Sequence, residues 1–316
     1  MRYIETLREG ERIQETYLCR QRTTAMTKTG KEYENVILQD KTGSLDAKIW
    51  DPHSMGIDEF DALDYVEVNG DVTVFNGQTQ LSIKRARKVS EESVDPSNYL
   101  PCTDKNMDEM MTELLKFIAS VNNPYYKQIL TTLFVEDANF AEAFKKHSAA
   151  KSVHHGFIGG LLEHTLSVTK LCDFYTKQYP ILNRDLLITS AICHDIGKVY
   201  ELSDFPSNEY TDAGQLLGHI VMGSEMLSKI IATIPDFPTK QANELKHCIL
   251  AHHGELEYGS PKKPALIEAV ALNFADNTDA KMETVMEIFK SNTTATSDQW
   301  LGYNRFLESN IRRTTE

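Results

Sequence analysis

The segment "ITSAICHDIGKVYEL", residues 188–202, combines a helical apolar pattern with three neighbouring polar groups. His194 and Asp195 place an imidazole and a carboxylate on consecutive residues, and Lys198 follows about one helical turn later. Imidazole nitrogen and carboxylate oxygen bind divalent metal ions in proteins. One such pair can arise by chance, so a metal site requires further ligands elsewhere in the chain.

Further candidate ligands follow in a fixed order. Nine of the ten histidines lie between residues 147 and 253, a clustering that surface histidines would not show. The candidate metal ligands are His164, His194, Asp195, His219, His252 and Asp276, with His253 as the alternative to His252. A carboxylate on Asp195 can bridge two ions while His194 binds one of them. Two ions about 3.5 to 4 Å apart can hold an attacking hydroxide and a phosphoryl oxygen together, as phosphodiester hydrolysis requires.

Each of these residues also has a structural interpretation. A single helical histidine, such as His219 or His247, is more often a hydrogen-bonded structural residue than a ligand. Asp276 in "FADNTD" could cap a helix. The ordered occurrence of "EHT", "HDIGK", "GH", "HHG" and "AD" favours the metal site over these separate explanations. We assign structural roles to His247 and Asp279.

The order of these ligands resembles the HD-domain metal-dependent phosphohydrolase superfamily, over residues 149–280. The resemblance implies that one ion is held by His164, His194, Asp195 and Asp276, and that Asp195 bridges to a second ion held by His219 and His252. Lys198, three residues after Asp195, falls on the same helical face and is suited to contact a substrate phosphate. Asp195 and Lys198 are therefore the candidate catalytic residues.

The first ninety residues predict short strands. "ENVILQDKTGSLDAKIWD" (34–51) predicts a hairpin with its turn at residues 41–44. "DYVEVNGDVTVFNGQTQLSIKRARKV" (64–89) predicts two more strands, with turn signals at Asn69-Gly70 and Asn76-Gly77. With an earlier strand around residues 13–22, about five strands suggest a small barrel that resembles a nucleic-acid-binding OB-fold.

After residue 90 the pattern changes twice. Residues 91–106 are rich in Ser, Asp and Pro and lack periodicity, which predicts a linker. From Met107 onward the apolar residues recur with the helical period. The predicted fold is therefore multidomain, with an OB-fold barrel at 1–90, a linker at 91–106 and an all-α HD domain at 107–316.

OB-folds commonly bind single strands with aromatic rings that stack on bases and basic residues that contact the backbone. The candidate nucleic-acid-binding residues are Arg20, Arg22, Tyr33, Lys48, Trp50, Lys84 and Arg85, with Phe75 and Arg87 as further candidates. Alternatively, Trp50 and Phe75 belong to the barrel core, and "KRARK" (84–88) is a solvated strand end.

A second feature, "AAKSVHHGFIGGLLEHT" (149–165), precedes the first ligand. Gly159-Gly160 allows close approach of the backbone to a phosphate or another helix. His154 and His155 are placed to bind substrate, at the scissile phosphate or the 3′ end.

With "HHGELEYGSPKKP" and "ADNTDAKME", this stretch resembles the YhaM-type 3′-to-5′ exoribonucleases over nearly the whole chain. The resemblance implies a divalent metal cofactor, with two ions per subunit and manganese expected. It also implies hydrolysis of single-stranded RNA from the 3′ end, with single-stranded DNA as a further substrate and nucleoside monophosphates as products. A homo-oligomer is compatible with the sequence.

The sequence leaves two alternative functions to compare with this one. An HD phosphodiesterase acting on a cyclic dinucleotide usually carries D-G-x-G-Y-P after the double histidine, whereas "GELEYGSPKKP" follows His253 here. A non-enzymatic single-strand-binding protein would need only the barrel, so the complete set of metal ligands favours the enzyme.

The composition limits the class of protein further. A net charge of -13 argues against binding nucleic acid by bulk attraction. The five scattered cysteines form no C-x-x-C pair and indicate neither disulfides nor a thiolate zinc site. No apolar run approaches the roughly 20 residues that span a bilayer, and "MRYIETLREGER" has no apolar signal core. We therefore expect a soluble, cytoplasmic protein without a membrane partner.

Overall fold

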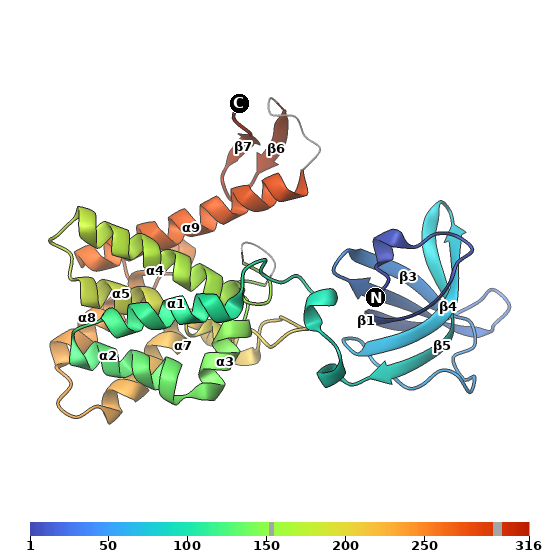
Figure 1. Ribbon diagram of the computed structural model, residues 1–316, viewed down its shortest axis with the longest axis horizontal. Coiled ribbons are helices and arrows are strands. Elements are labelled where there is room, and N and C mark those ends of the chain that lie inside the picture. The colour runs from blue at the N-terminus through green and yellow to red at the C-terminus, as the bar shows by residue number, and fades with distance from the viewer. Residues whose placement is uncertain (152–154, 293–298, 316) are drawn as a thin grey trace. The chain divides into compact units, whose positions relative to one another are not determined.

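The computed structural model describes residues 1–151, 155–292 and 299–315, and the chain divides into two compact units, Met1–Pro101 and Cys102–Glu316 (Figure 1). The division falls inside the segment 91–106. Part of that segment packs on the first unit, because Tyr99 and Leu100 are buried and the Tyr99 ring lies 4.9 Å from that of Tyr65.

The first unit is a closed barrel with the strand order β1-β2-β3-β5-β4. Its strands are β1 (Arg12–Met26), β2 (Glu32–Asp40), β3 (Gly43–Ile49), β4 (Tyr65–Phe75) and β5 (Gln78–Val89), with 3₁₀ turns η1 (Ile4–Thr6), η2 (Glu91–Ser93) and η3 (Pro96–Asn98). β3 and β5 pair in parallel, and the other neighbours are antiparallel. This is the OB-fold arrangement, so the predicted barrel is confirmed.

The two Asn-Gly pairs have different roles. Asn76-Gly77 forms the predicted turn between β4 and β5, with φ of 51° and 79°. Asn69-Gly70 lies inside β4, so the turn predicted there is wrong. A Cβ at Gly70 would overlap the carbonyl oxygen of Ser82 in β5, which shows that this glycine permits a close strand contact.

The second unit consists mainly of helices around one apolar core. Its helices are α1 (Met107–Ser120), α2 (Pro124–Thr131), the π-helical turn η4 (Thr132–Glu136), α3 (Ala138–Lys146), α4 (Gly160–Gln178), α5 (Arg184–Cys193), α6 (Lys198–Glu201), α7 (Asp212–Thr233), α8 (Thr239–Ala251), the 3₁₀ turn η5 (Leu256–Tyr258) and α9 (Ile267–Ser291). The helical pattern of residues 188–202 is divided between α5 and α6, with a turn between them. Gly197 lies in that turn, where glycine disfavours a continuous helix.

Helix α5 lies at the centre of this unit. Every residue from Leu186 to Cys193 is buried, and α5 packs against α4, α8 and α9. The segment that ends in His194 and Asp195 therefore packs against α4 and α9, which carry His164 and Asp276, and against α8, which ends next to His252. Residues 188–193 of the "ITSAICHDIGKVYEL" segment pack in the core. His194, Asp195 and Lys198 follow after the end of α5.

The second unit ends in a hairpin that the all-α prediction did not include. Strands β6 (Trp300–Asn304) and β7 (Ser309–Arg312) pair beyond the C-terminal end of α9 (Figure 1). Strands of five and four residues offer too few positions for an alternating pattern to be recognised.

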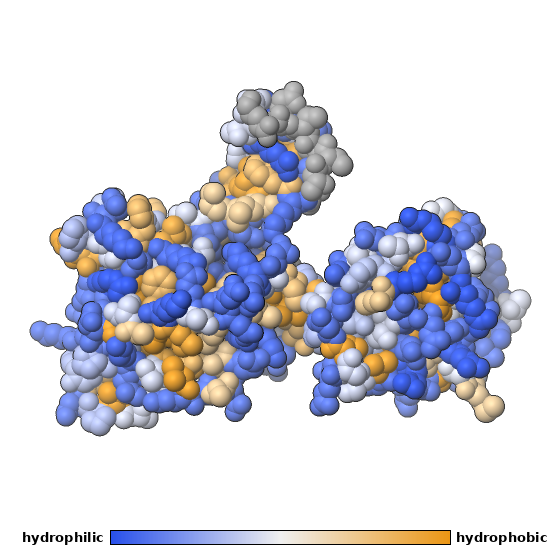
Figure 2. All heavy atoms as spheres, in the orientation of Figure 1, coloured by the Kyte–Doolittle hydropathy of each residue, from blue (hydrophilic) through white to orange (hydrophobic). Residues whose placement is uncertain are grey.

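The visible surface of both units is mostly hydrophilic, with hydrophobic residues in separate patches (Figure 2). Among the described residues, no helix has the length and hydropathy needed to cross a membrane.

Candidate metal centre

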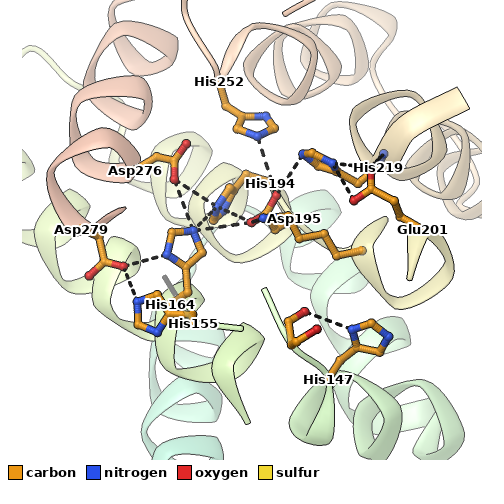
Figure 3. Close-up of polar contacts among 12 residues, drawn as sticks. His147, His155, His164, His194, Asp195, Glu201, His219, His252, Asp276 and Asp279 are labelled. Carbon is orange, nitrogen blue, oxygen red and sulfur yellow. Dashed lines mark hydrogen bonds and ion pairs between the residues drawn. The ribbon is translucent and has the colours of Figure 1, made fainter. Parts of the chain in front are cut away.

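Asp195 lies at the centre of a group of histidines contributed by several helices (Figure 3). Its Oδ2 lies 3.5 Å from His164 Nε2 and 3.4 Å from His194 Nε2. Its Oδ1 lies 3.4 Å from His219 Nε2 and 3.7 Å from His252 Nε2. The two oxygens of one carboxylate therefore face two different pairs of imidazoles, as a ligand that bridges two ions must.

Asp276 and His253 complete the two sides of the group. Asp276 Oδ1 lies 3.2 Å from His164 Nε2, and the potential ligand atoms of His164, His194 and Asp276 all lie within 4.8 Å of one another. The potential ligand atoms of His219, His252 and His253 also lie within 4.8 Å of one another. The structure thus places both members of the His252-His253 pair beside His219, and only His252 is within 4 Å of Asp195.

The five imidazoles are each anchored through Nδ1, which turns Nε2 toward the centre. Three of them donate to backbone carbonyl oxygens: His194 to Ala191 at 2.7 Å, His252 to Ile249 at 2.7 Å and His253 to Tyr258 at 2.8 Å. Because a carbonyl oxygen only accepts, the proton of each neutral ring lies on Nδ1 and Nε2 keeps its lone pair. These rings are therefore oriented as metal ligands in advance.

Asp279 anchors His164 in the same way. His164 Nδ1 donates to Asp279 Oδ2 at 2.7 Å, and Ser167 donates to the other carboxylate oxygen. The structural role assigned to Asp279 is thus too narrow, because this carboxylate orients a candidate ligand. The sequence contained one signal, since Asp279 follows Asp276 by three residues and falls on the same face of α9.

His155 does not take the position predicted for it. Its side chain is 2% exposed and its Nε2 lies 3.0 Å from Asp279 Oδ2, so it packs behind His164 instead of facing a substrate. A Cβ at Gly160 would overlap the carbonyl oxygen of His155, and one at Gly159 would crowd Thr103 and Met107, so both glycines permit close packing. His154 lies outside the described residues.

Glu201 is the corresponding anchor for His219. It accepts from both the backbone N–H and the Nδ1 of His219, at 2.9 Å each. Helix α7 is kinked at Gly218, where φ is 73°, so His219 begins a new helical run with Glu201 at its amino end. A Cβ at Gly197 would overlap the carbonyl oxygen of His219, so glycine lets the turn after Asp195 approach α7.

Lys198 lies on the same side as Asp195, as its spacing predicted, and forms an ion pair with it. The Nζ–Oδ2 distance is 2.6 Å, and the side chain is partly exposed. It also lines a cavity of about 580 Å³ together with His164, Asp195 and Asp276. His247 lies apart from this group and accepts from the backbone N–H of Ala265 at 2.8 Å, a structural role.

The charges in the centre suit cation binding. Burial opposes the ionised form of Asp195, but Lys198 and His194 outweigh it and hold the pKa of that carboxyl well below its usual range. Burial, followed by the neighbouring His253 and His194, lowers the pKa of His252 well below its usual range. Burial alone would lower the pKa of His164, but hydrogen bonds with Asp276 and Asp279 raise it to about 10, so a cation bound at its Nε2 would have to displace a proton. Asp195 is thus anionic, and His252 is a neutral imidazole.

The barrel carries a separate aromatic surface. The rings of Tyr33 and Trp50 stack 5.2 Å apart, and Lys48 Nζ lies 5.4 Å from the centre of the Tyr33 ring. Trp50 is 48% exposed and Phe75 is 66% exposed, so the alternative that they belong to the barrel core is wrong. The pairing of β2 with β3 brings Tyr33, Lys48 and Trp50 together.

The basic candidates of the barrel are not equivalent. Arg22 donates to Glu34 at 2.8 Å and lies over the Phe60 ring, so it stabilises the barrel. Lys84 is paired with Asp71, and Arg87 lies 4.0 Å from Glu67. Arg20 is exposed, and Arg85 lies beside Gly56 in a separate hollow of the barrel.

Comparison with known proteins agrees with this geometry. Residues 161–281 match the family model of the HD domain. The chain is 37% identical over 274 residues to the 3′-5′ exoribonuclease YhaM of Bacillus subtilis strain 168, with 86% of each chain covered. It is 34% identical over 287 residues to the 3′-5′ exoribonuclease YhaM of Listeria innocua serovar 6a, with 89% of each covered.

Among solved structures, the second OB-fold domain of replication protein A from Methanococcus maripaludis matches 30% of this chain and 98% of its own, at 19% identity and a TM-score of 0.24. The two relatives from Bacillus subtilis and Listeria innocua show the family of the chain, and the HD-domain match agrees with it. The chain belongs to the YhaM family of 3′-5′ exoribonucleases.

Proposed function

We propose that this chain removes nucleotides from the 3′ end of single-stranded RNA with two divalent ions that share Asp195, and releases nucleoside monophosphates. Its family makes it a 3′-5′ exoribonuclease, and its HD domain implies dependence on a divalent metal. The observation that supports two ions is the position of the Asp195 oxygens, each of which faces its own pair of imidazoles. Manganese as the ion and single-stranded DNA as a second substrate are part of the proposal.

The side chains fit such a metal pair. Asp195 Oδ1, His219 Nε2 and His252 Nε2 are buried and have no hydrogen-bond partner among the described residues, whereas buried polar atoms normally have one. One ion would be held by His164, His194, Asp195 and Asp276, and the other by Asp195, His219 and His252, with His253 beside them. Nitrogen and oxygen ligands without thiolate suit manganese and similar ions. Such ions, when bound, activate water for attack and stabilise negative charge on phosphoryl oxygens.

The chain's own groups position the substrate. Lys198 donates to Asp195 and has further N–H donors for a phosphate that enters the cavity. Asp279 and Glu201 keep His164 and His219 in one orientation. The barrel would bind the strand on its 5′ side, with bases stacked on the surface formed by Tyr33 and Trp50.

The test compares a linear RNA with the same RNA closed into a circle. With manganese, the linear form should shorten stepwise from its 3′ end and release nucleoside monophosphates, and the circle should stay intact. A chelator should stop the reaction. Cleavage of the circle, or no hydrolysis of either form, would contradict the proposal.

A further inference from the structure

The cavity over the metal centre has a wall that comes from the C-terminal hairpin. The turn between β6 and β7, residues 305–308, lines the same cavity as His164 and Asp195. The volume of about 580 Å³ lies within the range of about 300 to 1,000 Å³ that is common for ligand pockets. It therefore offers room for more of a nucleic-acid chain than the phosphate under attack.

Two cations line this cavity, and neither has a carboxylate partner among the described residues. Lys281 follows Asp276 by five residues on α9, and Arg305 lies in the hairpin turn. Neither makes a hydrogen bond or an ion pair with any part of the chain that the structure describes. Lys290, also on α9, is paired with Asp104 instead. Glu308 lies in the same turn as Arg305. Because Lys281 and Arg305 are both cationic, these three side chains together still carry a net positive charge.

We propose that Lys281 and Arg305 bind the phosphate immediately 5′ of the scissile phosphate. This inference rests on the proposed function, which places the scissile phosphate beside Asp195 and Lys198. The strand continues 5′ from that point, so its next phosphate must be accommodated on another part of the cavity wall. An arginine fork and a lysine ammonium both form charge-assisted hydrogen bonds with phosphate oxygens.

Two dinucleotides that differ by one group test the assignment. The first carries a 5′-phosphate at the position in question, the second ends in a 5′-hydroxyl, and both contain the same scissile bond. The wild-type chain should prefer the first by about 10-fold or more in kcat/KM. Arg305→Gln and Lys281→Gln should each reduce this preference by a factor of about 3, and the double variant should remove it. Hydrolysis of the 5′-hydroxyl dinucleotide should stay unchanged.

Arg312→Gln is the matched control, because Arg312 lies in the same hairpin but does not line the cavity. Arg312→Gln should leave the preference for the 5′-phosphate dinucleotide intact. Arg305→Lys should keep part of the preference that Arg305→Gln loses. On longer RNA, each lost contact should reduce the slope of log kcat/KM against log salt by about 0.7.

Two results would overturn the inference: an unchanged preference in the double variant, or an equal loss on both dinucleotides. A wild-type chain that hydrolyses neither dinucleotide nor long RNA would count against the proposed function itself.

Discussion

The metal centre and the aromatic surface of the barrel differ in how closely the fold constrains their side chains. Asp195 and His252 are fully buried, and each candidate imidazole is fixed through Nδ1. Trp50 is half exposed and stacks on Tyr33. Chemistry benefits from fixed groups, whereas stacking accepts any base. Substitutions in the metal centre should therefore lower kcat, and substitutions on the aromatic surface of the barrel should raise KM for long RNA.

The largest expected effect is that of Asp195→Asn. Asparagine keeps the shape of the side chain but removes the charge that both sides of the centre share, so we expect kcat to fall by at least about 10³-fold. Circular dichroism should show an intact fold, because an amide oxygen can still accept from Lys198. Near-normal turnover of the metal-replete variant would refute the bridging role.

Lys198→Met should come next. The ammonium lies 2.6 Å from Asp195 Oδ2 at the cavity, where it can stabilise charge that develops on a phosphate. Losing one such donor typically costs about 10² to 10³ in kcat. The measurement is kcat on a short RNA with a 3′-hydroxyl, with metal content determined in parallel. Lys177→Met, at an exposed position of α4, is the control. An unaltered rate at full metal occupancy would mean that Lys198 has only a structural role.

Asp279→Asn probes the anchoring of a ligand without removing the ligand. The carboxylate fixes His164 through Nδ1, and loss of such a partner typically costs about 10 to 100-fold in metal affinity or activity. Metal titration by calorimetry should show the weaker affinity directly. Asp104→Asn removes an exposed carboxylate from the same unit and should change nothing. Equal affinities for the two variants would show that Asp279 is not an anchor.

The smallest expected effect on catalysis is that of Trp50→Ala. Stacking is worth about 1 to 3 kcal/mol per base, so KM for long RNA should rise about 5- to 150-fold while kcat on a dinucleotide stays the same. Phe174→Ala, at an exposed aromatic residue of α4, is the matched control. If both variants behave alike, the barrel surface does not bind the strand.

The same contrast explains which features could be predicted from the sequence. The order of His164, His194 and Asp195 is visible because each residue is chemically distinctive and lies in a strong helical pattern. The barrel strands are visible through their alternation and through the Asn76-Gly77 turn. A pattern along the chain can show these features, because they depend on local spacing.

Features that depend on packing between distant segments could not be predicted in this way. The hydrogen bond between Asp279 and His164 joins residues 115 positions apart, and Gly70 is required by the close approach of Ser82 in the neighbouring strand β5. His155 resembled a substrate ligand because the sequence did not show which side of the loop is buried. The hairpin at the cavity was missed because its strands are too short to produce a pattern.

The most direct test of the shared role of Asp195 is the anomalous diffraction of a manganese-loaded crystal. We expect two manganese peaks about 3.5 to 4 Å apart, one beside each oxygen of Asp195. His164, His194 and Asp276 should surround the first peak, and His219 and His252 the second. A single peak at full occupancy, or two peaks of which only one contacts Asp195, would contradict it.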